Sequence, residues 1–270
     1  MLRYAAHLSI AFKEVPFYER FQRAADLGFS AVEFMSPFDY DVDQVIQAAR
    51  DSGVRVVQYN FFNGDLAGGE RGFASHPDKR DQWREWFLRA LELVPRLGAR
   101  QLTALAGCAV PGLDRETQVQ CLVDNCQWAA EHLEKVGAPM TLEALNPWEH
   151  QGYLLTCSQH VFDVLARVGS PWIKYQYDMY HMQRVEGDLV RTIREHVGEI
   201  GHVHVADNPG RHQPGTGEIN YRFVLRALDE AGYEGYVGLE YVPPGRTEDS
   251  FDWLPRAIRG VPSTSDDLNL

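Results

Sequence analysis

The stretch Ile200–Tyr221, IGHVHVADNPGRHQPGTGEINY, begins with a short apolar alternation that ends in a polar cluster. A loop rich in glycine and proline follows and carries Arg211 and His212, and the segment closes where a helical pattern begins. A strand that brings a histidine to its carboxyl end and continues into a long polar loop is typical of an active-site sector in an α/β barrel. The stretch therefore predicts a barrel strand with His204 at its functional end.

The same unit, a short apolar run followed by an amphipathic helical pattern, repeats along nearly the whole chain. The runs predict strands at residues 3–10, 31–34, 55–60, 101–106, 140–144, 173–178, 200–205 and 236–241. Helical patterns follow at residues 16–27, 42–51, 80–97, 115–136, 158–168, 187–197, 221–231 and 248–258. Such alternation implies parallel strands with right-handed crossovers.

Eight such units in 270 residues favour closure into a single (β/α)8 TIM barrel of the α/β class over an open sheet. The absence of a GxGxxG motif after the first strand also argues against a dinucleotide-binding sheet. We assign residues 1–260 to the barrel catalytic domain. The polar residues 261–270 are expected to form a flexible C-terminal tail.

The charge balance and the cysteine pattern narrow the classes of function. The chain has 26 Lys and Arg against 38 Asp and Glu, a formal net charge of −12, which opposes binding to nucleic acid or to anionic membranes. The apolar N-terminal segment is too short for a membrane span and has no small-residue cleavage site. Cysteines lack CxxC spacing, so we expect reduced thiols in a cytoplasmic protein, at Cys108, Cys121, Cys126 and Cys157.

Four consecutive strand ends carry side chains that bind divalent cations. These are Glu143, Asp178, His204 and Glu240, each about one strand–helix unit from the next. Because consecutive strands are neighbours in a closed barrel, the four are expected to converge on one point. Three carboxylates and an imidazole favour Mg²⁺ or Mn²⁺, with Co²⁺ or Zn²⁺ as alternatives. Each residue taken alone has a plain alternative as a helix cap, surface group or core histidine, and their coincidence is what favours a metal site.

Further polar residues near the strand ends are candidates for binding substrate. His7 and Asn60 end the first and third predicted strands, whereas His181 and Arg211 follow strands six and seven. A surface loop histidine and a solvated arginine are the alternative interpretations of the last two. The loop 61–79 suits a lid or an interface in a homo-oligomer, with core packing as the alternative.

Longer motifs carry a family resemblance over essentially the whole chain except its last residues. They are TLEALNP (141–147), YDMYH (177–181), HVHVADNPGRH (202–212), GTGEINY (215–221) and GLEYVPPGRT (238–247), with AAHLS, EVPF and AVEF near the N-terminus. These motifs resemble the hydroxypyruvate isomerase family of xylose isomerase-like barrels. Sugar epimerases and apurinic-site endonucleases belong to the same superfamily.

The resemblance implies metal ligands at Glu143, Asp178, position 204 and Glu240, with Glu143 and Glu240 as an acid/base pair. It also implies that His181 and Arg211 contact substrate oxygens. Hydroxypyruvate isomerases carry Gln where this chain has His204, whereas sugar 3-epimerases carry His. They also commonly carry Asn where this chain has His7.

We therefore expect a metal-dependent aldose–ketose isomerase acting on a small hydroxycarbonyl acid. The simplest reaction converts hydroxypyruvate to tartronate semialdehyde (2-hydroxy-3-oxopropanoate) through an enediolate. A ketose 3-epimerase or a related sugar or sugar-acid isomerase is the nearest alternative. An apurinic-site endonuclease would need a histidine-rich trinuclear zinc cluster and a surface that tolerates DNA, and a non-catalytic sugar-binding barrel is the remaining alternative.

Overall fold

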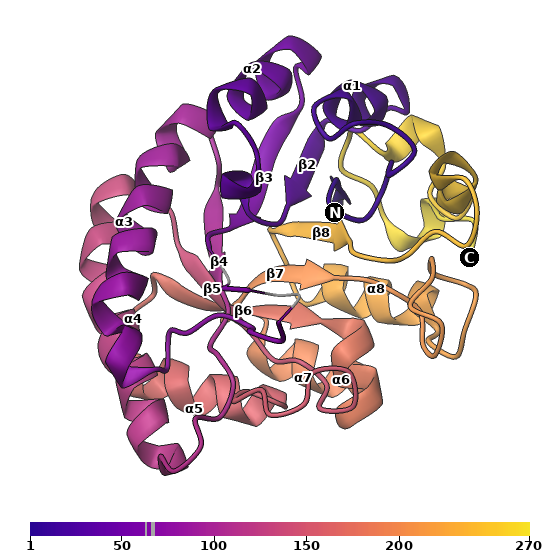
Figure 1. The fold of residues 1–270 in the computed structure, drawn as a ribbon. Helices are drawn as coiled ribbons and strands as arrows, with labels where there is room; N and C mark the ends of the chain where they lie inside the picture. The colour runs from indigo at the N-terminus through magenta and orange to yellow at the C-terminus, as the bar shows by residue number, and fades with distance from the viewer. Residues whose placement is uncertain (63, 66–67) are drawn as a thin grey trace.

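The computed structural model describes residues 1–62, 64–65 and 68–270, and these residues form the predicted (β/α)8 barrel (Figure 1). Its strands are parallel and close in sequence order, so that β1 pairs with both β2 and β8. The strands are β1 (Arg3–His7), β2 (Ala31–Phe34), β3 (Arg55–Asn60), β4 (Gln101–Ala104), β5 (Met140–Glu143), β6 (Ile173–Asp178), β7 (Ile200–His204) and β8 (Tyr236–Leu239).

The helices surround the strands, as Figure 1 shows, and bury one apolar face against them. Those that connect successive strands are α1 (Glu19–Asp26), α2 (Val42–Ser52), α3 (Arg80–Leu97), α4 (Arg115–Val136), α5 (Ser158–Val168), α7 (Leu189–His196) and α8 (Tyr221–Glu230). Among the described residues, no helix is long and apolar enough to cross a membrane.

Two regions differ from the predicted elements. A short helix, α6 (Met179–Val185), begins directly after β6 because the Asp178 carboxylate accepts hydrogen bonds from the backbone N–H groups of Tyr180 and His181. The prediction of a helix at residues 248–258 is wrong. The segment forms two 3-10 turns, η3 (Thr247–Phe251) and η4 (Arg256–Ile258), since Pro255 between them has no N–H to continue a helix.

The last ten residues, expected to form a flexible tail, are packed onto the barrel. Ser263 pairs with Leu2 in an antiparallel bridge, and the 3-10 turn η5 (Ser265–Asp267) follows. The guanidinium of Arg222 in α8 donates hydrogen bonds to the backbone oxygens of Leu268 and Leu270. The side chain of Leu268 is buried at 3% exposure, so a hydrophobic contact holds this polar segment in place.

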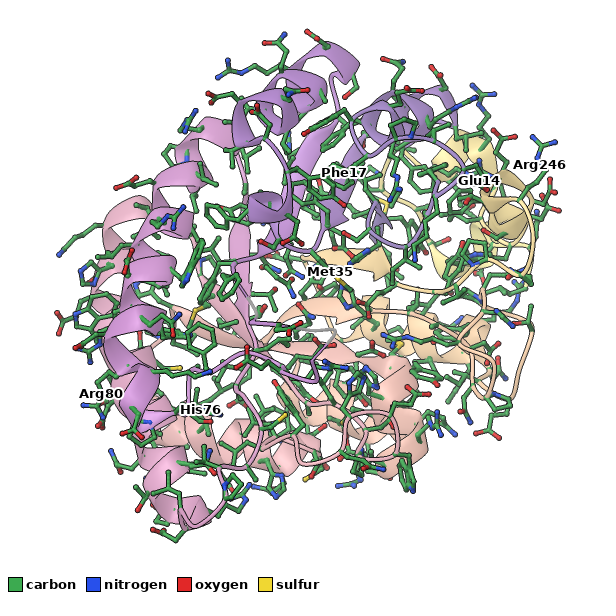
Figure 2. All side chains as sticks on the ribbon, in the orientation of Figure 1. Glu14, Phe17, Met35, His76, Arg80 and Arg246 are labelled. Atoms are coloured by element: carbon green, nitrogen blue, oxygen red, sulfur yellow. The ribbon has the colours of Figure 1, made fainter. Side chains whose placement is uncertain are left out.

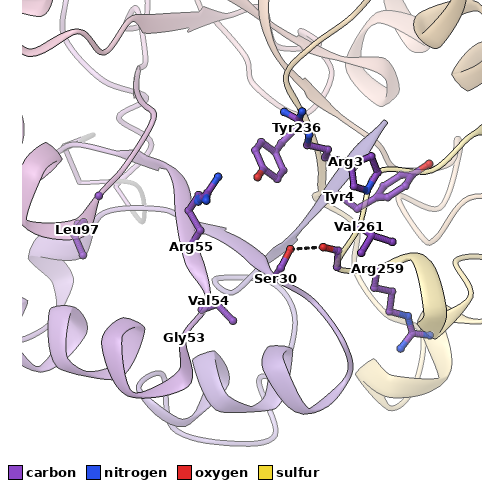
Figure 3. Close-up of a pocket in the computed structure, with 13 residues that line it drawn as sticks. Arg3, Tyr4, Ser30, Gly53, Val54, Arg55, Leu97, Tyr236, Arg259 and Val261 are labelled. Atoms are coloured by element: carbon purple, nitrogen blue, oxygen red, sulfur yellow. Dashed lines mark hydrogen bonds between the residues drawn. The ribbon is translucent and has the colours of Figure 1, made fainter. Parts of the chain in front are cut away.

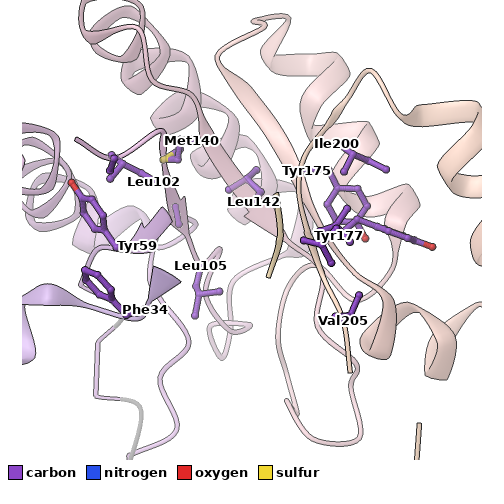
Figure 4. Close-up of a cluster of buried hydrophobic side chains, with 14 of the residues drawn as sticks. Phe34, Tyr59, Leu102, Leu105, Met140, Leu142, Tyr175, Tyr177, Ile200 and Val205 are labelled. Carbon is purple, nitrogen blue, oxygen red and sulfur yellow. The ribbon is translucent and has the colours of Figure 1, made fainter. Parts of the chain in front are cut away.

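Strand alternation divides the barrel into an apolar outer layer and a polar interior. In β6, Tyr175 and Tyr177 lie among the apolar side chains between strands and helices (Figure 4). The intervening Gln176 points inward, where its side-chain oxygen accepts hydrogen bonds from Gln58 of β3 and Thr103 of β4. These interior polar groups therefore satisfy one another, and the candidate functional side chains lie at the carboxyl ends of the strands.

The loop after β3 is covered by the described residues except for positions 63, 66 and 67. The tryptophans that follow it favour the core-packing interpretation, because Trp83 is buried against Phe61 and Trp86 stacks on Phe62.

Candidate active site

The four ligand-type side chains meet at the carboxyl end of the barrel. Glu143, Asp178 and His204 are the last residues of β5, β6 and β7, and Glu240 directly follows β8. Strand pairing sets Asp178 opposite His204. All four are buried, and one oxygen or nitrogen atom from each lies within 4.8 Å of those of the others.

The chemistry of this cluster fits a divalent cation. Oε1 of Glu143 and Oδ2 of Asp178 are buried and accept no hydrogen bond from the described residues. Buried carboxylate oxygens normally have partners, and several carboxylates in one buried site repel one another. A hard cation would satisfy these oxygens and offset the repulsion.

The surroundings shift the pKa values of the three carboxyl groups in different directions. Burial raises the pKa of Glu143 well above its usual value, and the neighbouring Glu240 carboxylate adds to the shift. Burial also raises the pKa of Asp178, to about 6, although Arg211 opposes this change. Burial alone would raise the pKa of Glu240 too, but Arg211 and His204 outweigh the effect of burial and hold this pKa well below its usual range.

Arg211 reaches the cluster from the loop between β7 and α8. Its Nη2 lies 2.7 Å from Oε2 of Glu240 and 3.8 Å from Oδ2 of Asp178. Its backbone has a φ of 53°, in the left-handed region, and its N–H donates to the Asp207 carbonyl. The loop therefore holds the guanidinium in the site through the backbone as well as through the ion pairs.

Asp207 organises this loop. Its buried carboxylate accepts hydrogen bonds of 2.9 to 3.1 Å from the backbone N–H groups of Asn208, Gly215, Thr216, Gly217 and Ile219. Gly217 allows the loop to close, because a Cβ there would lie 2.0 Å from the carbonyl oxygen of Asn208. The glycine- and proline-rich loop is thus a fixed structure built around one carboxylate.

A cavity of about 200 Å³ opens onto the cluster. Its lining contains the candidates Glu143, Glu240, His181, Arg211 and Asn60, together with Met35, Arg71, Leu105, Leu145 and His150. Figure 2 shows Met35 near the centre of the barrel, whereas Arg80 and Arg246 lie at its periphery. Substrate-sized space and the candidate ligands therefore coincide.

His181 offers a proton donor to this cavity. Its Nδ1 lies 2.7 Å from the side-chain amide nitrogen of Asn146, which donates to it. Burial lowers the pKa of His181 well below its usual value, and Arg211 acts in the same direction. The ring is therefore neutral, with its proton on Nε2, 3.8 Å from Oδ2 of Asp178.

His7 lies beside the cluster at the end of β1. Its side chain is almost fully buried, with its Nε2 3.7 Å from Oε1 of Glu240, and it is not among the residues that line the cavity. Its contact with substrate stays a prediction.

A larger cavity, of about 570 Å³, lies at the opposite end of the barrel (Figure 3). Arg3, Arg55 and Tyr236, the first residues of β1, β3 and β8, contribute to its lining. None of the four clustered ligand-type residues lines it. Choosing the active-site cavity by its volume alone would select the amino-terminal end of the barrel. The clustered side chains that can perform chemistry lie at the carboxyl ends of the strands.

Several residues of the site were given no role by the sequence. Arg71, His150 and Asn146 come from loops whose position depends on the tertiary fold. His202 carried a usable signal, since alternation places it on the same inward face as His204. Glu33 lies in the predicted strand 31–34, but its partners come from β7, across the barrel interior.

Comparison with known proteins agrees with this architecture. Residues 21–257 match the family model described as xylose isomerase-like TIM barrel. The chain is 37% identical to the hydroxypyruvate isomerase of Escherichia coli (strain K12), over 94% of this chain and 98% of that protein. It is 36% identical to the 2-oxo-tetronate isomerase of Pectobacterium atrosepticum, over 94% and 97% of the two chains.

Among solved structures, the crystal structure of an AP endonuclease, family 2, from Brucella melitensis superposes with a TM-score of 0.91 at 38% identity, over 94% of this chain and 98% of that one. The extent of the family match and the near-complete coverage of the isomerases lead to one assignment. The chain belongs to the xylose isomerase-like TIM barrel family and is an isomerase.

Proposed function

We propose that the protein is a metal-dependent isomerase of a small hydroxycarbonyl acid, converting hydroxypyruvate to tartronate semialdehyde. The observation that carries the proposal is the convergence of Glu143, Asp178, His204 and Glu240 on a small cavity. Its volume of about 200 Å³ is below the roughly 300–1,000 Å³ of sites for drug-sized ligands, which favours a substrate of few carbon atoms.

The four converging side chains would hold the cation, for which Mg²⁺ and Mn²⁺ are the best matches to the donor set. When bound, it would stabilise negative charge on adjacent substrate oxygens and so acidify the intervening C–H bond.

The chain's own carboxyl groups supply the proton transfer. The reaction removes a proton from C3 of hydroxypyruvate and returns one to C2, while the C3 hydroxyl proton moves to the C2 oxygen. Glu143 and Glu240 both line the cavity, so one can remove the proton and the other can return one.

The cavity also presents groups that recognise an oxyanion and a carboxylate. The Nε2 proton of neutral His181 is available to the substrate oxygen that gains charge. Two guanidinium groups, Arg71 and Arg211, line the same cavity, which supports an acid as the substrate. Either guanidinium could pair with the substrate carboxylate, and Arg211 already pairs with Glu240 beside the cavity. The free cysteines among the described residues support a cytoplasmic location.

The test is incubation of the Mn²⁺-loaded protein in D2O with hydroxypyruvate, 2-oxo-tetronate and free ketoses, followed by ¹H NMR. We expect deuterium incorporation and an aldehyde product from hydroxypyruvate, or the corresponding change in the four-carbon acid. Failure to act on both acids while a ketose epimerises at C3 would refute the proposal.

A ketose 3-epimerase is the second candidate, and His204 is the observation that favours it. Its reaction would use the same glutamates on opposite faces of a ketose. The small cavity and its two arginines disfavour a neutral six-carbon substrate, and the ketose arm of the experiment decides between the two functions.

A further inference from the structure

A buried carboxylate lies directly behind the candidate ligand His204. Glu33, in β2, extends across the barrel interior to β7, where its Oε1 is 3.0 Å from Nε2 of His204 and its Oε2 is 2.6 Å from Nε2 of His202. The three side chains are at most 2% exposed. In the described part of the chain, neither carboxylate oxygen has an aligned hydrogen-bond partner, and neither do the Nε2 atoms of the two histidines, so these short contacts are ion-pair contacts.

These contacts determine where the ring protons lie. A buried carboxylate that faced the lone pair of an imidazole nitrogen would be repelled, so the Nε2 atoms of His202 and His204 carry protons. On the other edge of the His204 ring, Nδ1 lies 3.4 Å from the amide nitrogen of Gln176 and 3.4 Å from Oε2 of Glu240. The Nδ1 edge of the His204 ring therefore faces the carboxylate cluster.

Gly238 in β8 makes room for the same contact. Strand pairing places it opposite His204. A Cβ at this position would lie 2.0 Å from Oε1 of Glu33 and 2.6 Å from Cδ2 of His204. Any larger residue would have to displace the Glu33 carboxylate from the His204 ring. Gly238 of β8 therefore leaves the space in which the side chains from β2 and β7 meet.

We propose that Glu33 is a positioning residue that holds His204 as its Nε2–H tautomer and thereby leaves Nδ1 to bind a divalent cation. The inference rests on the proposed metal site. A cation bound directly by His7, Glu33 and His204 is the competing arrangement, because their ligand atoms also lie within 4.8 Å of one another. The contacts of 2.6 and 3.0 Å bring a carboxylate oxygen against each ring nitrogen, and such a contact is attractive only when that nitrogen carries a proton.

The test measures metal affinity and the His204 tautomer, independently of turnover. Isothermal titration of Mn²⁺ into the metal-free parent and Glu33→Gln should show an affinity loss of about 10- to 100-fold, the usual effect of removing a partner of a metal-binding histidine. Gln101→Met is the matched control, since Gln101 is a buried polar residue of the same interior that bonds with Gln58 and contacts none of the candidate ligands. Its affinity should stay within about twofold of the parent.

The tautomer is read from ¹⁵N-histidine NMR of the Mg²⁺-loaded protein, in which His204 should be protonated at Nε2 and not at Nδ1. Protonation at Nδ1, or parent-like Mn²⁺ affinity in Glu33→Gln, would overturn the proposal. So would two equivalents of Mn²⁺ in the parent with one lost in Glu33→Gln, because Glu33 would then be a ligand itself.

If Glu33→Gln does not fold, Glu33→Asp retains the charge but withdraws it from the ring, and it should weaken Mn²⁺ binding less than tenfold but measurably. Unchanged affinity in that variant would overturn the positioning role. A parent that binds no divalent cation would refute the proposed function and this inference together, whereas a parent that binds Mn²⁺ independently of Glu33 would refute the inference alone.

Discussion

Replacing Asp207 by Asn tests whether one carboxylate holds the loop that presents Arg211. Oδ2 of Asp207 accepts from the N–H groups of Gly215, Thr216 and Gly217, and Oδ1 accepts from those of Asn208 and Ile219. An asparagine places its NH2 group against one of these two sets, and the less costly orientation still deprives two N–H groups of their acceptor. At about 1.5–3 kcal/mol for each hydrogen bond to a charged group, the free energy of unfolding should fall by roughly 3–6 kcal/mol.

Urea unfolding measures this loss, and hydrogen exchange should show faster exchange at the loop amides. Turnover should fall by about tenfold or more because Arg211 is displaced, whereas Mn²⁺ affinity should change much less because the candidate ligands lie on the strand ends. Asp114→Asn is the control: Asp114 caps α4 with a hydrogen bond from Thr117 N–H, a role that asparagine fills equally well. An Asp207→Asn protein within about 1 kcal/mol of the parent, with unchanged loop exchange, would refute the reasoning.

Three other outcomes are expected. Glu240→Gln should abolish turnover of the acid substrate with near-normal thermal unfolding, and an active variant would contradict its role as base. The pKa of Asp178 in the metal-free fold is about 6, above its ordinary 3.8, so its contribution to stability is present below pH 3.8 and is lost as the pH rises through 6. Metal binding requires the ionised form, so calorimetric Mn²⁺ affinity should fall by up to about tenfold per pH unit below pH 6, and constant affinity from pH 7 to 5 would contradict this. Leu268→Ala should lower the free energy of unfolding by about 2–3 kcal/mol in urea, whereas Val261→Ala, at an exposed position of the same segment, should change it little; equal effects would show that the segment is not docked through Leu268.

The barrel was predictable because its signals are local. Each apolar run and each amphipathic helix is visible within about a dozen residues, and parallel strands with short connections have few arrangements available. The failures also have local causes. Pro255 interrupts the final helical pattern, and the cap that starts α6 uses Asp178, a residue that the strand pattern assigns to β6. The docking of Leu268 depends on a surface formed by other elements, which the composition of the last ten residues does not reveal.

Residue types at strand ends were sufficient to choose Glu143, Asp178, His204 and Glu240, because closure of the barrel brings consecutive strand ends together. The surroundings of these residues were decided by the tertiary structure. Glu33 meets the histidines of β7 from β2, distant in sequence, and Asp207 gathers N–H groups from a loop with no regular pattern. The sequence by itself determined which side chains reach the end of the barrel, since that depends on strand period. Their protonation, their orientation and the shape of the cavity depend on contacts across the barrel, and only the folded chain creates those contacts.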